Sequence, residues 1–174
     1  MIYKLAKNDF KTKYAGSYLG IIWAFIQPVI TVLVYWFVFE VGFRGGSDSL
    51  PVPFVLYLVA GIIPWFFFQD GLTGGTNSLL EYSYLVKKVV FNISVLPVVK
   101  ILSAVFVHLF FIVFITFLYC CYGHFPDLYY LQLLYYLAGL LLLILGLSYL
   151  TSAVVVFFRD LSQMISIALQ IGIW

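Results

Sequence analysis

The chain holds four long runs of uncharged, mostly apolar residues, and all of its basic residues lie outside them. A bilayer core about 30 Å thick is crossed by about 20 helical residues. The runs cover residues 18–39, 54–69, 101–122 and 131–157. The second run is the shortest and contains Pro64, so we expect it to be kinked or extended by a further turn. The sequence therefore predicts an all-α, polytopic bundle of membrane-spanning helices.

Composition excludes most other classes of protein. Hydrophobic residues make up 64% of the 174 residues, charged residues only 9%, and the mean hydropathy is +1.10. A soluble monomer of this size needs a more polar surface. The formal net charge of +2 is too small to indicate binding of nucleic acid.

The placement of the basic residues predicts an orientation, because lysines and arginines near span ends favour the cytoplasmic side. They lie before the first run, between the second and third runs, and after the fourth run, at Lys4, Lys7, Lys11, Lys13, Lys87, Lys88, Lys100 and Arg159. The Gly/Ser/Pro-rich segment 42–53 holds only Arg44. We therefore expect a cytoplasmic N-terminus, with segment 42–53 and the turn at His124 on the outer side.

The first fifteen residues have the pattern of an amphipathic helix. Lys4, Lys7 and Lys11 are spaced three and four residues apart and form one stripe, whereas Phe10 lies among the apolar residues of the other side. We expect residues 1–15 to form an interfacial helix that lies on the membrane surface and contacts its lipids. In the alternative interpretation, these lysines only anchor the topology.

The residue types of common membrane catalysts are missing from the runs. None of the four contains Asp, Glu, Lys or Arg. His108 is interpreted as a neutral packing residue, with a relay or ligand as the alternative. Cys120, Cys121 and His124 lack a fourth metal ligand, and no phosphate-binding loop occurs. We predict no catalytic, metal or cofactor site, so energy for any transport must come from a partner.

Aromatic side chains are abundant, with 18 Phe, 14 Tyr and 4 Trp. Most are expected to face lipid or to pack between helices. A subset that faces a pore would offer flat, uncharged faces on which sugar rings can stack. We predict Trp23, Tyr35, Trp36 and Trp65 as the channel aromatics.

Several stretches of sequence resemble one known family. They include the opening LAKNDFKTKYAGSYLGIIWAFIQPV at residues 5–29, GIIPW at residues 61–65, LVKK at residues 85–88, and FFRD at residues 157–160. Together they resemble the ABC-2 type permeases of polysaccharide exporters, which serve O-antigen, capsule and teichoic-acid export. The resemblance covers essentially the whole chain as a single transmembrane domain, residues 1–174.

The resemblance implies a homodimeric channel bound to ABC ATPase subunits. It implies that residues 77–91 contain a coupling helix that docks in the ATPase. The residues expected to take part in coupling are Glu81, Lys87, Lys88, Arg159 and Asp160. Two alternatives remain open: Lys87 and Lys88 anchor the chain to anionic lipid, and Arg159 and Asp160 pair with each other or with a neighbouring helix.

The resemblance also implies export of a lipid-linked polysaccharide across the cytoplasmic membrane of a bacterium. A fifth apolar run begins at residue 161 and ends before it could cross, so we expect a truncated chain. The alternatives are an ABC-2 exporter of drugs or small hydrophobic molecules, a membrane enzyme acting on lipid-linked sugars, and a nonfunctional remnant of a permease.

Overall fold

The computed structural model describes the whole chain except residues 1, 14–17, 19, 43–52, 84–91 and 174. The described residues form helices and their connecting turns, without a strand. In chain order the elements are α1 (Ile2–Lys13), η1 (Gly20–Ile22), α2 (Trp23–Trp36), the π-helical η2 (Phe37–Gly42), α3 (Phe54–Glu81), α5 (Val95–Cys121), η4 (Leu128–Leu131), α6 (Gln132–Val155) and α7 (Leu161–Gly172). The predicted all-α fold is confirmed.

Four helical segments among the described residues are long and apolar enough to cross a membrane. They are Gly20–Phe39, Phe54–Glu81, Val95–Cys121 and Leu128–Val155. A multi-pass membrane protein follows from this length and composition.

Two of these helices extend beyond the runs expected from sequence. Helix α3 continues past residue 69 through Asp70 to Glu81, and α5 begins at Val95 and includes Lys100. The glycines and hydroxyl residues of α3 have low helix propensity or favour turns. They remain helical because Gly71, Gly75 and other small residues of this part are buried in the bundle.

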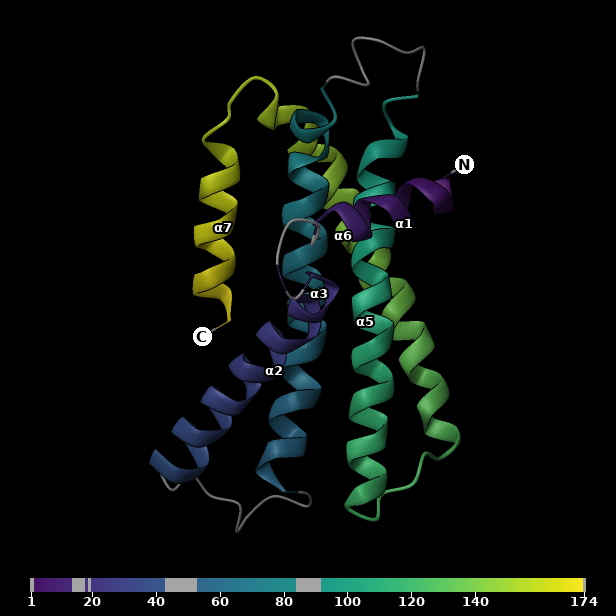
Figure 1. Cartoon of the computed structure of the whole chain (residues 1–174), viewed down its shortest axis with the longest axis vertical. Coiled ribbons are helices and arrows are strands. Elements are labelled where there is room, and N and C mark those ends of the chain that lie inside the picture. The colour runs from purple at the N-terminus through teal and green to yellow at the C-terminus, as the bar shows by residue number, and fades with distance from the viewer. Residues whose placement is uncertain (1, 14–17, 19, 43–52, 84–91, 174) are drawn as a thin grey trace.

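Helix α3 is the centre of the bundle (Figure 1) and contacts α2, α5, α6 and α7. On one side Phe67 packs with Ile101 of α5 and Ile144 of α6. On another side Val59 and Ile63 pack with α5 and with the apolar face of α2. The packing of these side chains against one another holds the helices together.

Helix α1 lies across the bundle near one end, roughly perpendicular to α3 and α5 (Figure 1). Ala6 is fully buried. The rings of Tyr3 and Phe10 meet the edge of Phe106 of α5, with centroids 5.9 and 6.0 Å apart. Phe10 therefore packs on the protein itself. The helix expected in this region is present, and its position on a membrane surface stays a prediction.

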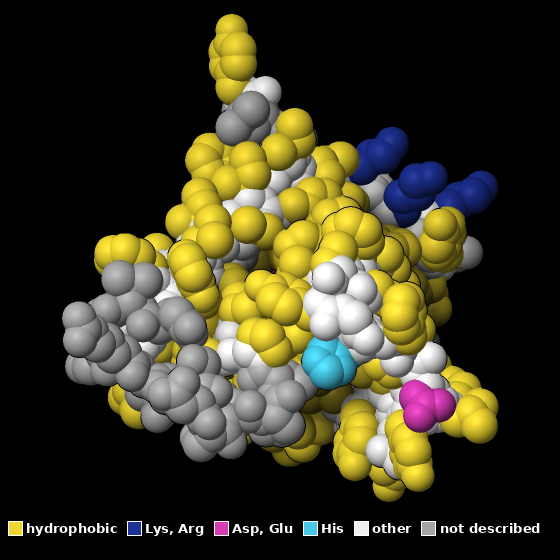
Figure 2. All heavy atoms as spheres, turned by 90° about the horizontal axis from the view of Figure 1, so that it is seen from below, with side chains coloured by type: hydrophobic (Ala, Val, Ile, Leu, Met, Phe, Trp, Pro, Cys, Tyr) yellow, Lys and Arg dark blue, Asp and Glu magenta, His cyan; other side chains and the backbone are white. Residues whose placement is uncertain are grey.

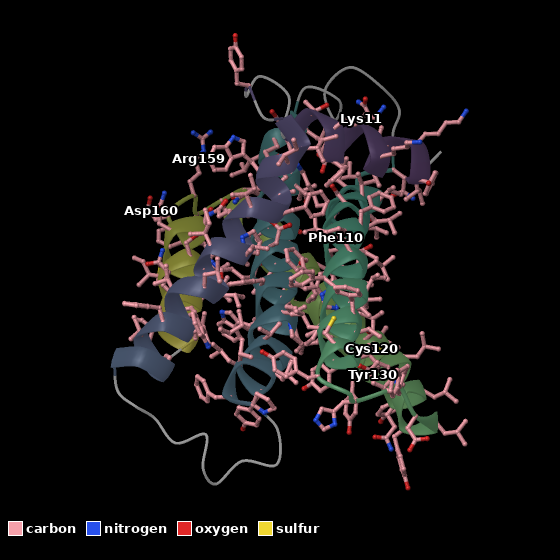
Figure 3. All side chains as sticks on the ribbon, turned by 60° about the horizontal axis from the view of Figure 1, so that its bottom comes forward. Lys11, Phe110, Cys120, Tyr130, Arg159 and Asp160 are labelled. Atoms are coloured by element: carbon pink, nitrogen blue, oxygen red, sulfur yellow. The ribbon has the colours of Figure 1, made fainter. Side chains whose placement is uncertain are left out.

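The charged side chains are unevenly distributed over the molecule. The lysines of the predicted α1 stripe, Lys4, Lys7 and Lys11, are exposed. Lys and Arg side chains gather on one side of the molecule in Figure 2, while hydrophobic side chains cover most of that view. Lys11 and Arg159 lie at one end of the bundle and Cys120 at the other (Figure 3). The side of the membrane that each end faces stays a prediction.

Helices α3 and α6 are in tight contact at Gly75. A β-carbon at Gly75 would lie 2.2 Å from the hydroxyl oxygen and 2.6 Å from the β-carbon of Ser148. Next to it, the hydroxyl groups of Thr76 and Thr151 are hydrogen-bonded at 2.7 Å. Small residues thus allow the two helices to pack closely and their side-chain hydroxyls to bond across the interface, as in many membrane helix pairs.

The first prediction concerns this contact. Gly75→Ala is expected to destabilise the protein by about 1–3 kcal/mol, because the added methyl group forces the two helices apart. Gly61→Ala is the matched control, since no atom lies within 4 Å of its β-carbon position. Thermal unfolding in mild detergent measures both variants. Equal midpoints would contradict the assignment of Gly75 as the tight contact.

Candidate functional site

A cavity of about 710 Å³ lies between α2, α3, α5 and α7. Its polar and aromatic lining residues, which define what we call the central groove, are Lys13, Trp23, Gln27, Thr31, Tyr35, Phe66, Phe67, Gln69, Asp70, Thr73, His108, Phe111 and Gln170. Amide and hydroxyl groups thus lie among flat rings and aliphatic side chains. This is the lining expected of a site for an uncharged, polar ligand.

Helical spacing brings the α2 residues of the groove to one face. Trp23, Gln27, Thr31 and Tyr35 follow one another at intervals of four residues, so they lie in one row along the helix. The hydroxyl of Thr31 donates a 3.0 Å hydrogen bond to the Gln27 carbonyl. Polar side chains inside a span are costly against lipid and usually face the bundle or a water-filled cavity. In this chain Trp23 and Gln27 of the row are exposed, whereas Thr31 and Tyr35 are half-buried.

Two of the four predicted channel aromatics line the central groove. Trp23 and Tyr35 belong to its wall, whereas Trp36 and Trp65 are not among its lining residues. Trp36 follows Tyr35 directly and so points about 100° away around the helix. Trp65 packs instead against α7, where a β-carbon on Gly172 would lie 2.7 Å from the indole ring.

Phe66, Gln69 and Gln170 were missed as groove residues in the sequence analysis. Gln27 and Thr31 were also missed, although their four-residue spacing from Trp23 was a usable signal. For Gln170 no such signal existed, because its position depends on how α7 packs against the bundle.

His108 lies in the middle of α5 and lines the inner wall of the groove. It is 6% exposed and its ring stacks on Phe67 with centroids 4.4 Å apart. Its Nδ1 atom has no hydrogen-bond partner among the described residues. The stacked ring fits the packing role expected from the sequence. Within the part of the chain that the structure describes, no three His, Cys, Asp or Glu side chains cluster to hold a metal ion.

A buried ion cluster joins α1 to the ends of α3 and α5. Nζ of Lys100 lies 2.7 Å from Oδ1 of Asp9, and these side chains are 11% and 6% exposed. Lys100 also pairs with Glu81, and the hydroxyl of Tyr82 donates to Asp9. The positive charge of Lys100 thus offsets the charge of a carboxylate that would otherwise be buried alone.

A second ion pair connects the end of α1 with the middle of α3. Lys13 pairs with Asp70, and their side chains are 41% and 39% exposed. Ion pairs of this exposure contribute little to stability. Neither Asp9 nor Asp70 was predicted as a site residue. Asp9 does share the Ala6 side of α1, three residues further on, which was the available signal.

The predicted coupling residues lie in different environments. Glu81 pairs with Lys100 while its side chain remains 52% exposed. Arg159 and Asp160 are exposed in the turn between α6 and α7, and their side chains point away from the bundle (Figure 3). Neither forms an ion pair with a described residue. Lys87 and Lys88 lie outside the described residues.

The two ion pairs generate the second prediction. Lys100→Met should destabilise the protein by about 3–5 kcal/mol, because Asp9 then remains buried without a cation. Lys13→Met should cost about 0–1 kcal/mol, because both partners of that pair reach solvent. Denaturant unfolding of the purified variants compares the same substitution in two settings. A similar loss for both would show that burial does not distinguish the pairs.

Comparison with known proteins gives a consistent result. The family model for "ABC-2 type transporter" matches residues 2–174. An O-antigen export system permease protein, RfbA, of Klebsiella pneumoniae is 28% identical over 170 residues, which are 96% of this chain and 63% of that protein. The protein of the same name from Myxococcus xanthus is 27% identical over 166 residues, covering 95% of this chain and 62% of the relative. The chain therefore spans somewhat less than two thirds of these relatives.

Proposed function

The chain belongs to the ABC-2 type transporter family, and we propose on this premise that it is the permease subunit of an exporter of lipid-linked polysaccharide. A separate ATPase subunit supplies the energy, and this chain supplies the path through the membrane. It is not itself the site of ATP hydrolysis.

The lining of the central groove is the observation that carries the substrate class. Its aromatic rings offer faces for sugar rings, and its three glutamines and two threonines offer hydrogen bonds without charge. Apart from the Lys13–Asp70 ion pair, these groups are uncharged and hold no sugar unit tightly, which suits a polymer that must slide. The relatives whose names specify O-antigen export support the same class.

The end of the bundle that carries α1 is proposed as the cytoplasmic end. Lys11 and Arg159 lie there, and excess basic charge favours the cytoplasm. The N-terminus is then cytoplasmic, and α1 lies at the inner surface of the bacterial cytoplasmic membrane. Its exposed lysines Lys4, Lys7 and Lys11 are suited to anionic lipid headgroups.

Coupling to the ATPase is proposed at two places on this end. One is the segment from residue 77 to 91, with Glu81, Lys87 and Lys88, and the other is the exposed turn with Arg159 and Asp160. We further propose that two copies of the permease assemble with their central grooves facing a shared path. Support for the dimer comes from the family alone.

The third prediction tests the substrate. Trp23→Leu combined with Tyr35→Leu should abolish surface display of the polysaccharide. Leucine keeps both positions apolar but offers no flat ring on which a sugar can stack. Trp36→Leu is the matched control, since Trp36 lies on the same helix outside the groove lining. Polysaccharide on the cell surface is measured by labelling of intact cells that also express the ATPase.

Retained export of the polymer by the double variant would contradict the proposal. An exporter of small hydrophobic molecules, the alternative function, would tolerate leucine in the groove. An enzyme acting on lipid-linked sugars would transfer sugar without an ATPase. Purified protein that did so would also overturn it.

The fourth prediction tests the coupling segment. Lys87→Glu with Lys88→Glu should release the ATPase subunit during purification in mild detergent, because the reversal removes two positive charges that the proposed docking uses. Lys4→Glu with Lys7→Glu reverses two charges on the exposed face of α1 and should leave the ATPase bound. Loss of the ATPase from both variants, or from neither, would contradict the proposed docking role of Lys87 and Lys88.

A further inference from the structure

A second cavity lies between α3, α5 and the beginning of α6, and has a volume of about 380 Å³. We name it the tyrosine pocket, after the four tyrosines among its lining residues, which are Tyr119, Tyr129, Tyr130 and Tyr136. Tyr130 lies at the end of the bundle opposite Lys11 and Arg159 (Figure 3). The pocket therefore belongs to the end that carries few charges.

The pocket occupies the space where α3 and α6 are no longer in direct contact. The two helices are packed tightly at Gly75 and at Gly71, where an added β-carbon would lie 3.1 Å from the Ile144 side chain. About two turns earlier in α3, Ile63 and Pro64 line the pocket instead. The cavity thus follows from the position of the small residues, which hold the helices together only in one half of the bundle.

The pocket is elongated and its middle section is apolar. Its α5 wall runs along one face of the helix from His108 to Tyr119, a rise of about 16 Å. Between these residues lie Ile112, Ile115 and Thr116, and the hydroxyl of Thr116 donates a 2.8 Å hydrogen bond to the Ile112 carbonyl. This section therefore offers a ligand hydrocarbon contacts and no free donor.

The phenol groups gather at the other end of the slot, which we call its mouth. Tyr129 and Tyr136 are 75% and 67% exposed, and Gln132 lies between them in sequence. They belong to Leu128–Val155, one of the segments long and apolar enough to cross a membrane. A slot with hydroxyl groups at the mouth and hydrocarbon below has the polarity of a membrane lipid, which also surrounds this part of the protein.

The charge around the mouth selects among lipid headgroups. No Lys or Arg is among the described residues that line the pocket. The carboxylate nearest in sequence is Asp127, which lines the adjoining surface groove together with Tyr130. Aromatic rings attract ammonium groups, and a carboxylate adds to this attraction. The mouth therefore favours a headgroup with an ammonium group over one whose net charge is negative.

We propose that the tyrosine pocket binds one hydrocarbon chain of a zwitterionic phospholipid, with the ammonium group of the lipid among the tyrosine rings of the mouth. The phenol hydroxyls and the Gln132 amide are donors for the lipid phosphate. The chain lies along α5 toward His108. This site is separate from the proposed path for polysaccharide, and its occupancy does not depend on transport.

The test counts the lipids that stay on the purified protein. Equal amounts of phosphatidylethanolamine and phosphatidylglycerol with the same two acyl chains are added in mild detergent, and native mass spectrometry measures how much of each is retained. Phosphatidylethanolamine should be retained about two- to fivefold more than phosphatidylglycerol, the factor expected for an ammonium group on exposed aromatic rings.

Two variants separate the headgroup from the chain. Tyr129→Leu with Tyr136→Leu should abolish the preference while the total retained lipid stays similar, because the apolar section is unchanged. The matched control is Tyr57→Leu with Tyr122→Leu, which removes two exposed tyrosines that do not line the pocket and should keep the preference.

Ile112→Trp fills the apolar section and should lower the total retained lipid. Val113→Trp places the same ring on the neighbouring residue, which is 69% exposed and does not line the pocket, and should leave retention unchanged. Thermal unfolding shows whether both tryptophan variants are folded. The tyrosine variants alter exposed side chains and so test the site independently of packing.

Equal or greater retention of phosphatidylglycerol by the unchanged chain would overturn the proposal, as would loss of the preference in the Tyr57 and Tyr122 control. A polyisoprenyl diphosphate is the third probe. If it displaced phosphatidylethanolamine from the unchanged chain, the pocket would belong to the lipid part of an exported substrate, and a phospholipid site would be wrong. None of these outcomes depends on whether the chain exports polysaccharide.

Discussion

The buried ion pair between Asp9 and Lys100 fixes the arrangement on which the rest of this end of the molecule depends. It holds α1 against α5 and draws in Glu81 at the end of α3. A buried charge pair contributes little net stability. It does fix the positions of its helices, because each buried charge must lie next to its partner. Its consequence is positional: Lys13, one turn further along α1, is brought to Asp70 at the edge of the groove.

The groove itself arises from a different constraint, the helical repeat of α2. Two rings and two polar side chains at intervals of four residues form a single row along the groove. Helices α3, α5 and α7 complete the wall with further amides, rings and aliphatic side chains. Apart from the Lys13–Asp70 ion pair and His108, the polar groups of the lining are neutral amides and hydroxyls.

Much of the fold could be predicted from the sequence because bilayer thickness sets the length of apolar runs. The candidate site was only partly predictable. Trp23 and Tyr35 were predicted as channel aromatics and line the groove, whereas Trp36 and Trp65 were predicted and do not line it. Residue type alone does not tell in which direction around a helix a side chain points. Asp9 was missed because its importance depends on a partner far away in the sequence, and the extension of α3 was missed because packing overrides low helix propensity.

The most direct test of the central claim is photo-crosslinking in living cells that make the polysaccharide. A photoreactive amino acid at Thr31, inside the groove, is compared with one at Val113, which is 69% exposed on the outer side of α5. The account predicts a ladder of polymer-linked protein from position 31 and none from position 113. Crosslinks to polymer at position 113 alone, or equally at both positions, would show that the polymer does not pass through the groove.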